Sequence, residues 1–329
     1  MMRIGLWDTI INIFLEDSLI TDVSNDTRFL HAVELGLGAW QWGDRVVWQY
    51  GRGYNDVDIR QAFQASIAEG IRFIDTAEVY GSGRSERLIG QFIKDTDQPV
   101  LVATKFFPYP WRLSKNSIPA ALKRSLERLK LDIVDLYQVH TPTPLLSPEF
   151  MMEGMLFCVE KGLTRTVGVS NFNQAYMLRA YSTLARHNIP LASNQVHFSI
   201  LNRTVEKNGL LARCKELGIR LIAYSPLEMG ILSGKYGPEN PPPGTRGSRY
   251  STMLGKLSPL LKVMTEMGQD HGGKSNAQVA LNWVICKDAL PIPGAKNGEQ
   301  ALQNAGALGW KLTEEEISKL DSVSDEIMK

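Results

Sequence analysis

A carboxylate and a phenol stand five residues apart at the end of one apolar run in this sequence. In GIRFIDTAEVYG (residues 70–81), Asp75 closes the run and Tyr80 follows it, while Lys105 and His140 end two later runs. A phenol has a pKa of about 10, and a nearby ammonium group favours its ionised form. A carboxylate can hold that ammonium group, and an imidazole can orient a carbonyl oxygen. The four groups suit the protonation of an oxygen that becomes an alkoxide.

Other chemistries fit these residues less well. The set has no strong nucleophile and no second carboxylate in a similar setting. The histidines and cysteines show neither metal-ligand spacing nor a CxxC pair, so we expect no metal and no disulfide framework. A hydrolase or lyase with a metal on Asp75 and His140 is one alternative, but it leaves Tyr80 and Lys105 without a role. Each of these residues also has a structural interpretation on its own, such as a helix cap for Asp75.

The composition is that of an ordinary globular protein. Of 329 residues, 43% are hydrophobic and 22% charged, and the net charge is +1, so no basic surface is expected to bind nucleic acid or an anionic membrane. No segment approaches membrane-spanning length. We expect each cysteine (Cys158, Cys214 and Cys286) to be a small buried residue on a helix, in a reducing cytoplasm.

The chain is expected to form one barrel domain, residues 30–329, preceded by an arm, residues 1–29, of uncertain order. The arm lacks the basic start and the cleavage site of a secretory signal. The sequence leaves the oligomeric state open, with a monomer as the default.

Short apolar runs alternate with amphipathic helical patterns along the domain. The runs are residues 35–38, 71–75, 100–104, 133–139, 166–170, 192–196, 220–224 and 289–292. The helical patterns include 58–69, 117–129 and 207–217, with apolar residues three and four positions apart. This alternation predicts an α/β fold with a parallel sheet covered by helices. The number of runs favours a (β/α)8 TIM barrel, and no GxGxxG follows the first run to support an open dinucleotide-binding sheet.

Polar residues stand at or just past the ends of successive runs. They are Asp75, Lys105, His140, Ser170, Asn171, Gln195 and Tyr224. In a barrel the carboxyl ends of the strands form one face, which carries the active site. The longest irregular stretch, residues 236–250, is rich in proline and glycine and is expected on the same face, where it could close over a ligand.

Seven motifs, in order, resemble the aldo-keto reductase superfamily. They are GIRFIDTAEVYG (70–81), VLVATK (100–105), DLYQVH (135–140), TVGVSNF (166–172), NQVHFSIL (194–201), AYSPLEMGILSGKY (223–236) and PIPGAKN (291–297). The resemblance covers residues 34 to 320 and implies a (β/α)8 barrel that transfers a hydride from NAD(P)H to an aldehyde or ketone. It implies that Tyr80 is the general acid, that Lys105 lowers the pKa of Tyr80, that Asp75 pairs with Lys105, and that His140 orients the substrate.

The resemblance also implies a cofactor site, with NADPH favoured over NADH. Ser170, Asn171 and Gln195 are expected at the nicotinamide carboxamide, and Tyr224 is expected to stack on the ring. Further cofactor-binding residues are Trp40, Ser225, Pro226, Leu227, Gly230, Lys235, Arg246, Gly294, Lys296, Gln300, Gln303 and Asn304. Gly294 would allow close backbone approach, and Lys296 would pair with a 2′-phosphate.

Departures from the family pattern limit what the resemblance implies. Many members carry Arg near Lys296 and Glu where Gln303 stands, and the HRPD-type continuation after the histidine is replaced by HTPTPLL (140–146). The loops around Trp40, Trp42 and residues 106–112 are aromatic and suit a flat or apolar carbonyl substrate. The C-terminal motifs are similar to bacterial and plastid-type members, some associated with pyridoxal reduction. The alternative within the family is a nucleotide-binding regulatory subunit with little turnover, like the potassium-channel β subunits.

Overall fold

Eight parallel strands follow one another in chain order around a single sheet, from β1 to β8. The strands are β1 (Leu37–Gly38), β2 (Phe73–Asp75), β3 (Leu101–Phe106), β4 (Val134–Val139), β5 (Thr164–Ser170), β6 (Leu191–His197), β7 (Arg220–Tyr224) and β8 (Leu290–Pro291). This computed structural model describes residues 26–328. Backbone N–H groups of Gly36 and Gly38 donate to the carbonyls of Pro291 and Pro293, both at 3.0 Å, so the first strand meets the last. The predicted (β/α)8 barrel is confirmed.

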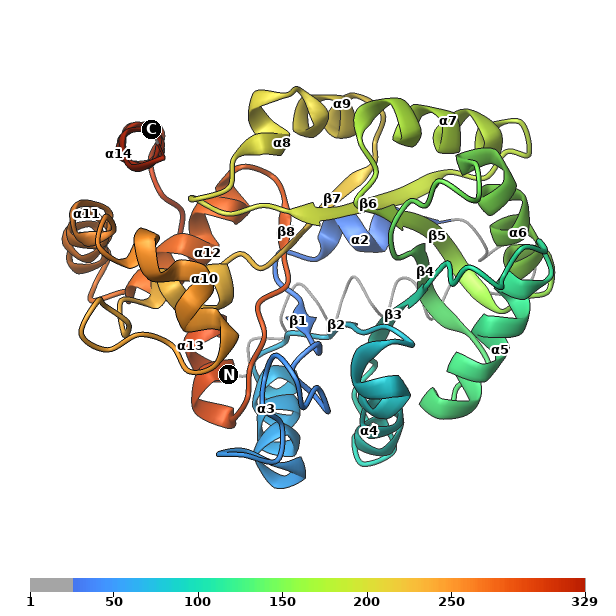
Figure 1. Cartoon of the computed structure of the whole chain (residues 1–329), viewed down its shortest axis with the longest axis horizontal. Coiled ribbons are helices and arrows are strands. Elements are labelled where there is room, and N and C mark those ends of the chain that lie inside the picture. Colours follow the sequence, from blue (N-terminus) through green and yellow to red (C-terminus); the bar gives the residue numbers. More distant parts are fainter. Residues whose placement is uncertain (1–25, 329) are drawn as a thin grey trace, which may run out of the picture.

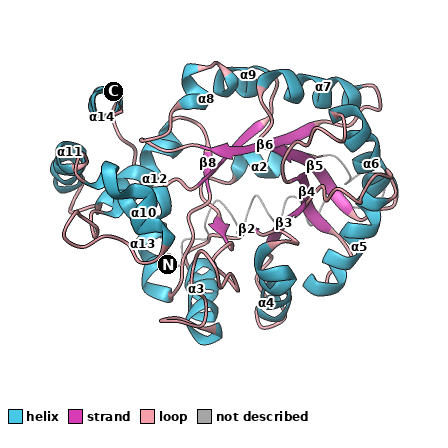
Figure 2. Cartoon of the chain, viewed as in Figure 1, coloured by secondary structure: helices cyan, strands magenta, loops and turns pink. Residues whose placement is uncertain are grey.

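The described residues form a set of helices, all of which except α2 lie outside the ring of strands in Figures 1 and 2. They are α2 (Arg28–Ala32), α3 (Asp56–Ala68), α4 (Arg84–Ile93), α5 (Ser117–Leu129), α6 (Pro148–Glu160), α7 (Gln174–Ala185), α8 (Thr204–Lys207), α9 (Leu210–Glu216), α10 (Thr245–Leu254), α11 (Ser258–Asp270), α12 (Asn276–Cys286), α13 (Gly298–Ala305) and α14 (Glu314–Ile327), with 3₁₀ turns η1 (Tyr80–Gly83) and η2 (Glu228–Ser233). The predicted helix at 117–129 coincides with α5, whose buried residues include Ile118, Leu122 and Leu129. Its apolar residues are three and four positions apart, so they lie on one face of the helix.

Two apolar layers hold the barrel together. The outer layer lies between the sheet and the helices. The inner layer fills the barrel and consists of Leu30, Val33, Phe73, Ala103, Leu136, Ala192, Ile222, Leu290 and Ile292. Leu30 comes from α2, so this short helix joins the inner core although it precedes the first strand. Side chains two positions further along a strand point to the same side of the sheet. The strands therefore carry four polar side chains inward, two positions after the inner-layer residues Phe73, Ala103, Leu136 and Ile222. These are Asp75, Lys105, Gln138 and Tyr224, respectively.

Closure of the barrel requires a glycine at residue 38. A Cβ on Gly38 would lie 2.7 Å from the carbonyl oxygen of Ile292. Real Cβ atoms do not approach backbone so closely, so a larger residue would push β1 away from the last strand segment. The sequence pattern marks this residue as part of an apolar run but does not reveal the close approach.

Some predicted boundaries are wrong. The helical pattern 207–217 is divided into α8 and α9 because Gly209, with a φ of 81°, separates the two helices. The loop predicted at 236–250 gives way to α10 from Thr245. The third strand extends to Phe106, so Lys105 lies within the strand. Of the three cysteines, Cys286 is only partly buried, unlike the buried Cys158 and Cys214.

The arm predicted at residues 1–29 lies mostly outside the described residues. Its last two residues, Arg28 and Phe29, belong to α2. None of the helices within residues 26–328 is long and apolar enough to cross a membrane. In the same range, no group of three or more His, Cys, Asp and Glu side chains could hold a metal ion.

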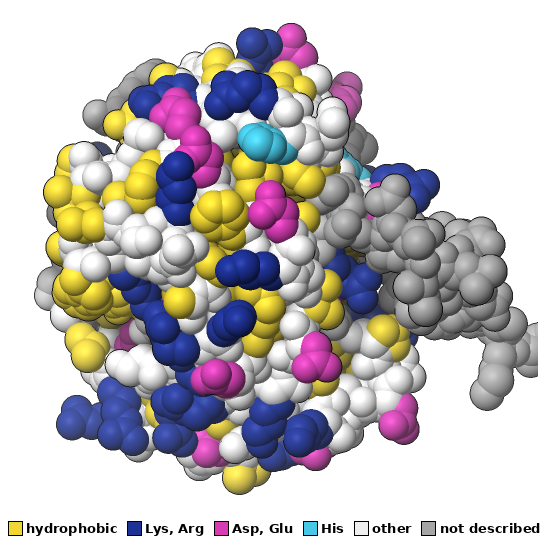
Figure 3. Space-filling view, turned by 90° about the vertical axis from the view of Figure 1, so that its right-hand side faces the viewer, with side chains coloured by type: hydrophobic (Ala, Val, Ile, Leu, Met, Phe, Trp, Pro, Cys, Tyr) yellow, Lys and Arg dark blue, Asp and Glu magenta, His cyan; other side chains and the backbone are white. Residues whose placement is uncertain are grey.

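Charges on the right-hand face of Figure 1 are of both signs. Figure 3 shows Lys and Arg side chains with Asp and Glu between them, and the basic ones gather towards the lower edge. Ion pairs on α6 and α7 include Arg179 with Glu149 (2.7 Å), which joins these two helices. Solvent and salt weaken ion pairs at such exposed sites.

Candidate active site

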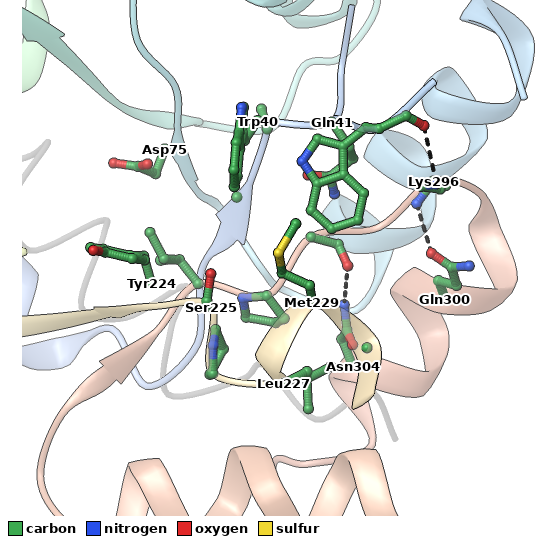
Figure 4. A pocket seen from close by; sticks show the side chains of 18 of the residues that line it. Trp40, Gln41, Asp75, Tyr224, Ser225, Leu227, Met229, Lys296, Gln300 and Asn304 are labelled. Atoms are coloured by element: carbon green, nitrogen blue, oxygen red, sulfur yellow. Dashed lines mark hydrogen bonds between the residues drawn. The ribbon is translucent and has the colours of Figure 1, made fainter. Parts of the chain in front are cut away.

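A cavity of about 800 Å³ opens at the carboxyl ends of the strands. Its walls contain nearly all of the predicted site residues, which come from loops far apart in the sequence. These are Trp40, Asp75, Tyr80, His140, Ser170, Asn171, Gln195, Tyr224, Ser225, Pro226, Leu227, Gly230, Lys235, Arg246, Gly294, Lys296, Gln300, Gln303 and Asn304. Figure 4 shows several of them around the cavity. Lys105 is the exception: it is fully buried directly beneath the cavity.

The Lys105 ammonium group lies at the centre of the predicted catalytic residues. Its Nζ donates to Asp75 Oδ1 (2.5 Å) and to the Thr76 carbonyl (2.8 Å), and it lies 3.5 Å from Tyr80 Oη. Lys105 and Asp75 are 0% and 2% exposed, so their ion pair is shielded from water. Burial lowers the pKa of Lys105, and the charge of Asp75 partly offsets this effect. A buried ion pair that touches a phenol is the arrangement that the sequence predicted.

The pKa of Tyr80 differs from the expectation. Burial, followed by the negative charge of Asp75 and by Tyr224, raises the pKa of Tyr80 well above its usual value of 10.0. The expected lowering by Lys105 is therefore not the net result, because burial, the largest effect, favours the neutral phenol and the charge of Asp75 adds to it. Tyr80 is consequently a neutral phenol in this state of the pocket, able to donate a proton.

Asp75 has two further hydrogen-bond donors that the sequence reasoning did not assign to it. Gln195 Nε2 donates to Asp75 Oδ2 at 2.8 Å, and Gln138 Nε2 lies 3.4 Å from the same oxygen. Gln195 was predicted to bind the nicotinamide; it lines the pocket, but its amide nitrogen is directed at the carboxylate. Gln138 was missed, although its position two residues before His140 on β4 indicates an inward side chain.

Local backbone geometry carries Tyr80 into the pocket. Tyr80 begins the η1 turn, in which Gly81 and Ser82 both have left-handed conformations, with φ of 53° and 55°. A Cβ on Gly81 would lie 2.6 Å from the carbonyl oxygen of Gly43. Glycine at residue 81 thus allows the turn to pack against the loop after β1.

His140 is a neutral imidazole at the end of β4. Its ring lies edge-on to Tyr80 and to Phe107, with centroids 5.7 Å apart in both cases. Burial, and then the positive charge of Lys105, lower the pKa of His140 from 6.5 to about 3. Its Nδ1 is buried without a hydrogen-bond partner among the described residues.

This low pKa predicts a pH dependence of stability. Between about pH 3 and 6.5 the unfolded chain protonates His140 but the folded chain does not, so the free energy of unfolding falls as the pH is lowered through this window. We expect His140→Gln to reduce the slope of unfolding free energy against pH by up to one proton in this window. Urea unfolding of both proteins between pH 4 and 8 measures the slope, and parallel curves would contradict the assignment.

One wall of the cavity carries Ser170, Asn171 and Tyr224. Tyr224 Oη donates to Asn171 Oδ1 (3.0 Å), and Asn171 Nδ2 lies 3.1 Å from both Ser170 Oγ and the His140 carbonyl. Asn171 has a positive φ of 61°, which turns its side chain towards these partners. The predicted nicotinamide contacts are thus brought together in one connected group.

Three cations line the opposite end of the cavity. Lys235, Arg246 and Lys296 form no ion pair with any of the described residues and lie against aromatic rings. Trp48 is placed between Arg246 and Lys296, with cation-to-centroid distances of 5.0 and 5.2 Å. Burial, and then the charges of Arg246 and Lys235, lower the pKa of Lys296 to about 8. The sequence did not predict these aromatic residues, Trp48 among them, as part of the site. Only their position in loops that follow strands could have indicated them.

Other predicted contacts shape the loop after β8. Gln300 Oε1 accepts the backbone N–H of Lys296 at 3.0 Å, and Asn304 Nδ2 donates to the Gly294 carbonyl at 3.3 Å (Figure 4). The space beside Gly294 is filled by Gln41, since a Cβ there would lie 1.9 Å from Gln41 Nε2. Gly294 therefore makes room for a side chain of the protein as well as lining the pocket.

The aromatic residues near the pocket are of two kinds. Trp42, which was expected to shape substrate choice, is fully buried and does not line the cavity: its Nε1 donates to the Ala295 carbonyl at 2.8 Å. Phe107 does line the cavity, and Tyr109 and Trp111 continue from it with stacked rings 4.7 Å apart. Trp111 is 74% exposed, so this aromatic series extends from the cavity to the surface.

The fold and the site define an oxidoreductase of the aldo-keto reductase class. Residues 34–325 match the model of the Aldo/keto reductase family, and the chain belongs to this family of NAD(P)-dependent enzymes.

Individual relatives agree with this classification. The chain is 41% identical over 308 residues to the chloroplastic pyridoxal reductase of Arabidopsis thaliana. The aligned region covers 90% of this chain and 84% of the relative. It resembles the glycerol dehydrogenase of Gluconobacter oxydans (25% identity, TM-score 0.78, 89% and 91% of the two chains). An aldo/keto reductase from Klebsiella pneumoniae, solved with NADP and acetate, matches with 29% identity and a TM-score of 0.70 over 88% of this chain and 91% of the relative.

The expected cytoplasmic location of the protein stays a prediction.

Proposed function

We propose that the cavity binds NADPH and that the protein reduces an aldehyde or ketone to an alcohol. The observation that carries the choice of cofactor is the group of three unpaired cations, Lys235, Arg246 and Lys296, at one end of the cavity. Cations that repel one another in a partly buried site are stabilised by an anionic ligand. The 2′-phosphate and pyrophosphate of NADPH are such anions, and the residues present fit them.

The remainder of the cavity fits the other end of the cofactor. Tyr224 offers a flat ring for the nicotinamide, and Ser170 and Asn171 offer a hydroxyl and an amide for its carboxamide. NADPH supplies a hydride for the carbonyl carbon. Trp40, Tyr80 and His140 lie on the walls next to Asp75, so the carbonyl compound would be held at this end.

Proton delivery is the task of the chain's own residues. The Tyr80 hydroxyl donates its proton to the carbonyl oxygen, and the O–H bond of Tyr80 breaks as that of the alcohol forms. The Lys105 ammonium group, 3.5 Å from Tyr80 Oη, stabilises the phenolate that remains. Asp75 keeps Lys105 in place, and neutral His140 orients the carbonyl through a ring N–H.

An aromatic aldehyde is the substrate class that we propose. Phe107 lines the cavity with its ring edge-on to His140, and Tyr109 packs against Phe107, so this part of the cavity offers an aromatic surface that suits a planar ring. A relative with 41% identity is named a pyridoxal reductase, so pyridoxal is the first aldehyde to test. NADPH consumption should be measured with pyridoxal, nitrobenzaldehyde, methylglyoxal and a simple ketone, with NADH in parallel. Turnover with NADPH supports the proposal, whereas tight binding without turnover would favour a regulatory nucleotide-binding subunit.

Lys296 tests the choice between the two nucleotides. Glu299 lines the same end of the cavity and opposes a 2′-phosphate, but three cations outnumber it. We expect Lys296→Ala to weaken NADPH binding by about 10–100-fold and NADH binding much less, because only NADPH offers a charged group to pair with the ammonium. Titration with both nucleotides measures the difference. Lys262→Ala, on the exposed face of α11, is the matched control, and equal losses for both nucleotides would argue against a phosphate contact.

A further inference from the structure

Glu228 is a buried carboxylate that the proposed chemistry does not use. Every other residue of the segment 225–230 lines the cavity, but Glu228 does not, and it is 4% exposed. Its φ of 48° and that of Met229, 53°, are left-handed conformations that non-glycine residues rarely adopt. The backbone is therefore held in a strained form that turns Glu228 away from the cavity and Met229 towards it.

Three side chains donate hydrogen bonds to this carboxylate, and they come from different elements. His197 Nε2 at the end of β6 and Ser199 Oγ just after it lie 2.6 and 2.5 Å from Oε1. Tyr250 Oη of α10 lies 2.9 Å from Oε2. Burial raises the pKa of Glu228, but the hydrogen bonds from His197, Ser199 and Tyr250 lower it below the usual value overall. The carboxylate is thus ionised and joins the segment 225–230 to β6 and α10.

The histidine in this network supports the predicted nicotinamide platform. The His197 ring is stacked on Tyr224, with centroids 5.4 Å apart and an angle of 14° between planes. Asn202 Nδ2 donates to His197 Nδ1 at 2.7 Å, so the Nε2 nitrogen carries the hydrogen that is donated to Glu228. Tyr224 is consequently fixed by His197 on one ring face and by Asn171 at its hydroxyl group.

The tyrosine in the network lies on the helix that carries a phosphate-end cation. Arg246 and Tyr250 are four residues apart on α10 and so lie on the same face of the helix. Arg246 Nη1 donates to the Met229 carbonyl at 3.2 Å, which adds a second link between α10 and the segment 225–230. The two ends of the cavity are therefore connected through residues that surround Glu228.

We propose that Glu228 is a positioning residue for the nucleotide: through His197 and Tyr250 it fixes Tyr224 and the segment 225–230 in one geometry that receives both ends of the cofactor. This inference rests on the proposed function, because it assigns Glu228 a role in NADPH binding. Glu228 acts only through its neighbours and does not itself line the cavity. Loss of its charge should therefore affect the dissociation constant of NADPH.

The test measures the Kd of NADPH by quenching of tryptophan fluorescence, together with Tm, for the full chain and its variants. We expect Glu228→Gln to raise the Kd by about tenfold or more. His197→Phe keeps a ring on Tyr224 but removes the hydrogen bond, so it should raise the Kd alone and add little in the Glu228→Gln background. Tyr250→Phe removes one donor and should raise the Kd several-fold, so the proposal stays testable even where Glu228→Gln fails to fold.

A control separates positioning from stability. Asp135 on β4 is a carboxylate of which 15% is exposed, and it is paired with Arg165 away from the cavity. Asp135→Asn should lower Tm without changing the Kd. A Glu228→Gln protein that loses Tm like this control, with a Kd within about twofold of the wild type, would overturn the proposal. If the wild-type chain itself fails to bind NADPH, the proposed function fails, and that result is distinct from a loss confined to the variants.

Discussion

Replacement of Tyr80 by phenylalanine is expected to lower the kcat of aldehyde reduction by about 10²–10⁴-fold, the range that general acid catalysis contributes. The Tyr80 hydroxyl, 3.5 Å from the Lys105 ammonium group, is the proton donor that we assign to the reaction. Phenylalanine keeps the ring that contacts His140 and Trp40 but has no proton to give. Steady-state kinetics with NADPH and the best aldehyde of the panel measures the loss.

The binding of NADPH should change little in this variant, because we assign the phenol to the substrate oxygen and not to the nucleotide. Tyr137→Phe is a matched control: Tyr137 is fully buried and its hydroxyl has no hydrogen-bond partner among the described residues. We expect that control to keep its turnover. Near-normal kcat in Tyr80→Phe would show that another group delivers the proton.

Replacement of Lys105 by methionine is expected to impair both turnover and stability. Removal of one partner of a buried ion pair leaves an unpaired charge and costs about 3–5 kcal/mol of unfolding free energy. Here Asp75 would keep the amide of Gln195 but lose the ammonium group at 2.5 Å. The phenolate of Tyr80 would also lose its stabilising cation, so kcat should fall even where the variant is folded. Urea unfolding and steady-state kinetics measure the two effects.

A double variant separates the two effects. Asp75→Asn in the Lys105→Met background removes the unpaired carboxylate, so we expect it to recover part of the lost stability. It should not recover turnover, because the ammonium group next to Tyr80 is still missing. Recovery of kcat together with stability would mean that Lys105 acts only by holding the fold.

Much of the barrel could be predicted from the sequence because its signals are local. Helix α5 has apolar residues every three or four positions, and the strand positions follow short apolar runs. Errors arose where one residue interrupts a pattern, as Gly209 does between α8 and α9. Trp42 was expected near the substrate together with Trp40. Its side chain is instead fully buried, and its Nε1 donates a hydrogen bond to the Ala295 carbonyl.

The sequence by itself determined which side chains stand at the strand ends, since alternation along a strand decides which of them face inward. The tertiary structure alone decided which partners they meet. Gln195 reaches Asp75 across 120 residues, and Glu228 collects donors from β6 and α10. The same holds for the pKa of Tyr80, which rises because burial and the charge of Asp75 act together on it. The local sequence pattern cannot predict these hydrogen bonds and pKa shifts. They depend on which groups from distant parts of the chain are buried together, away from water.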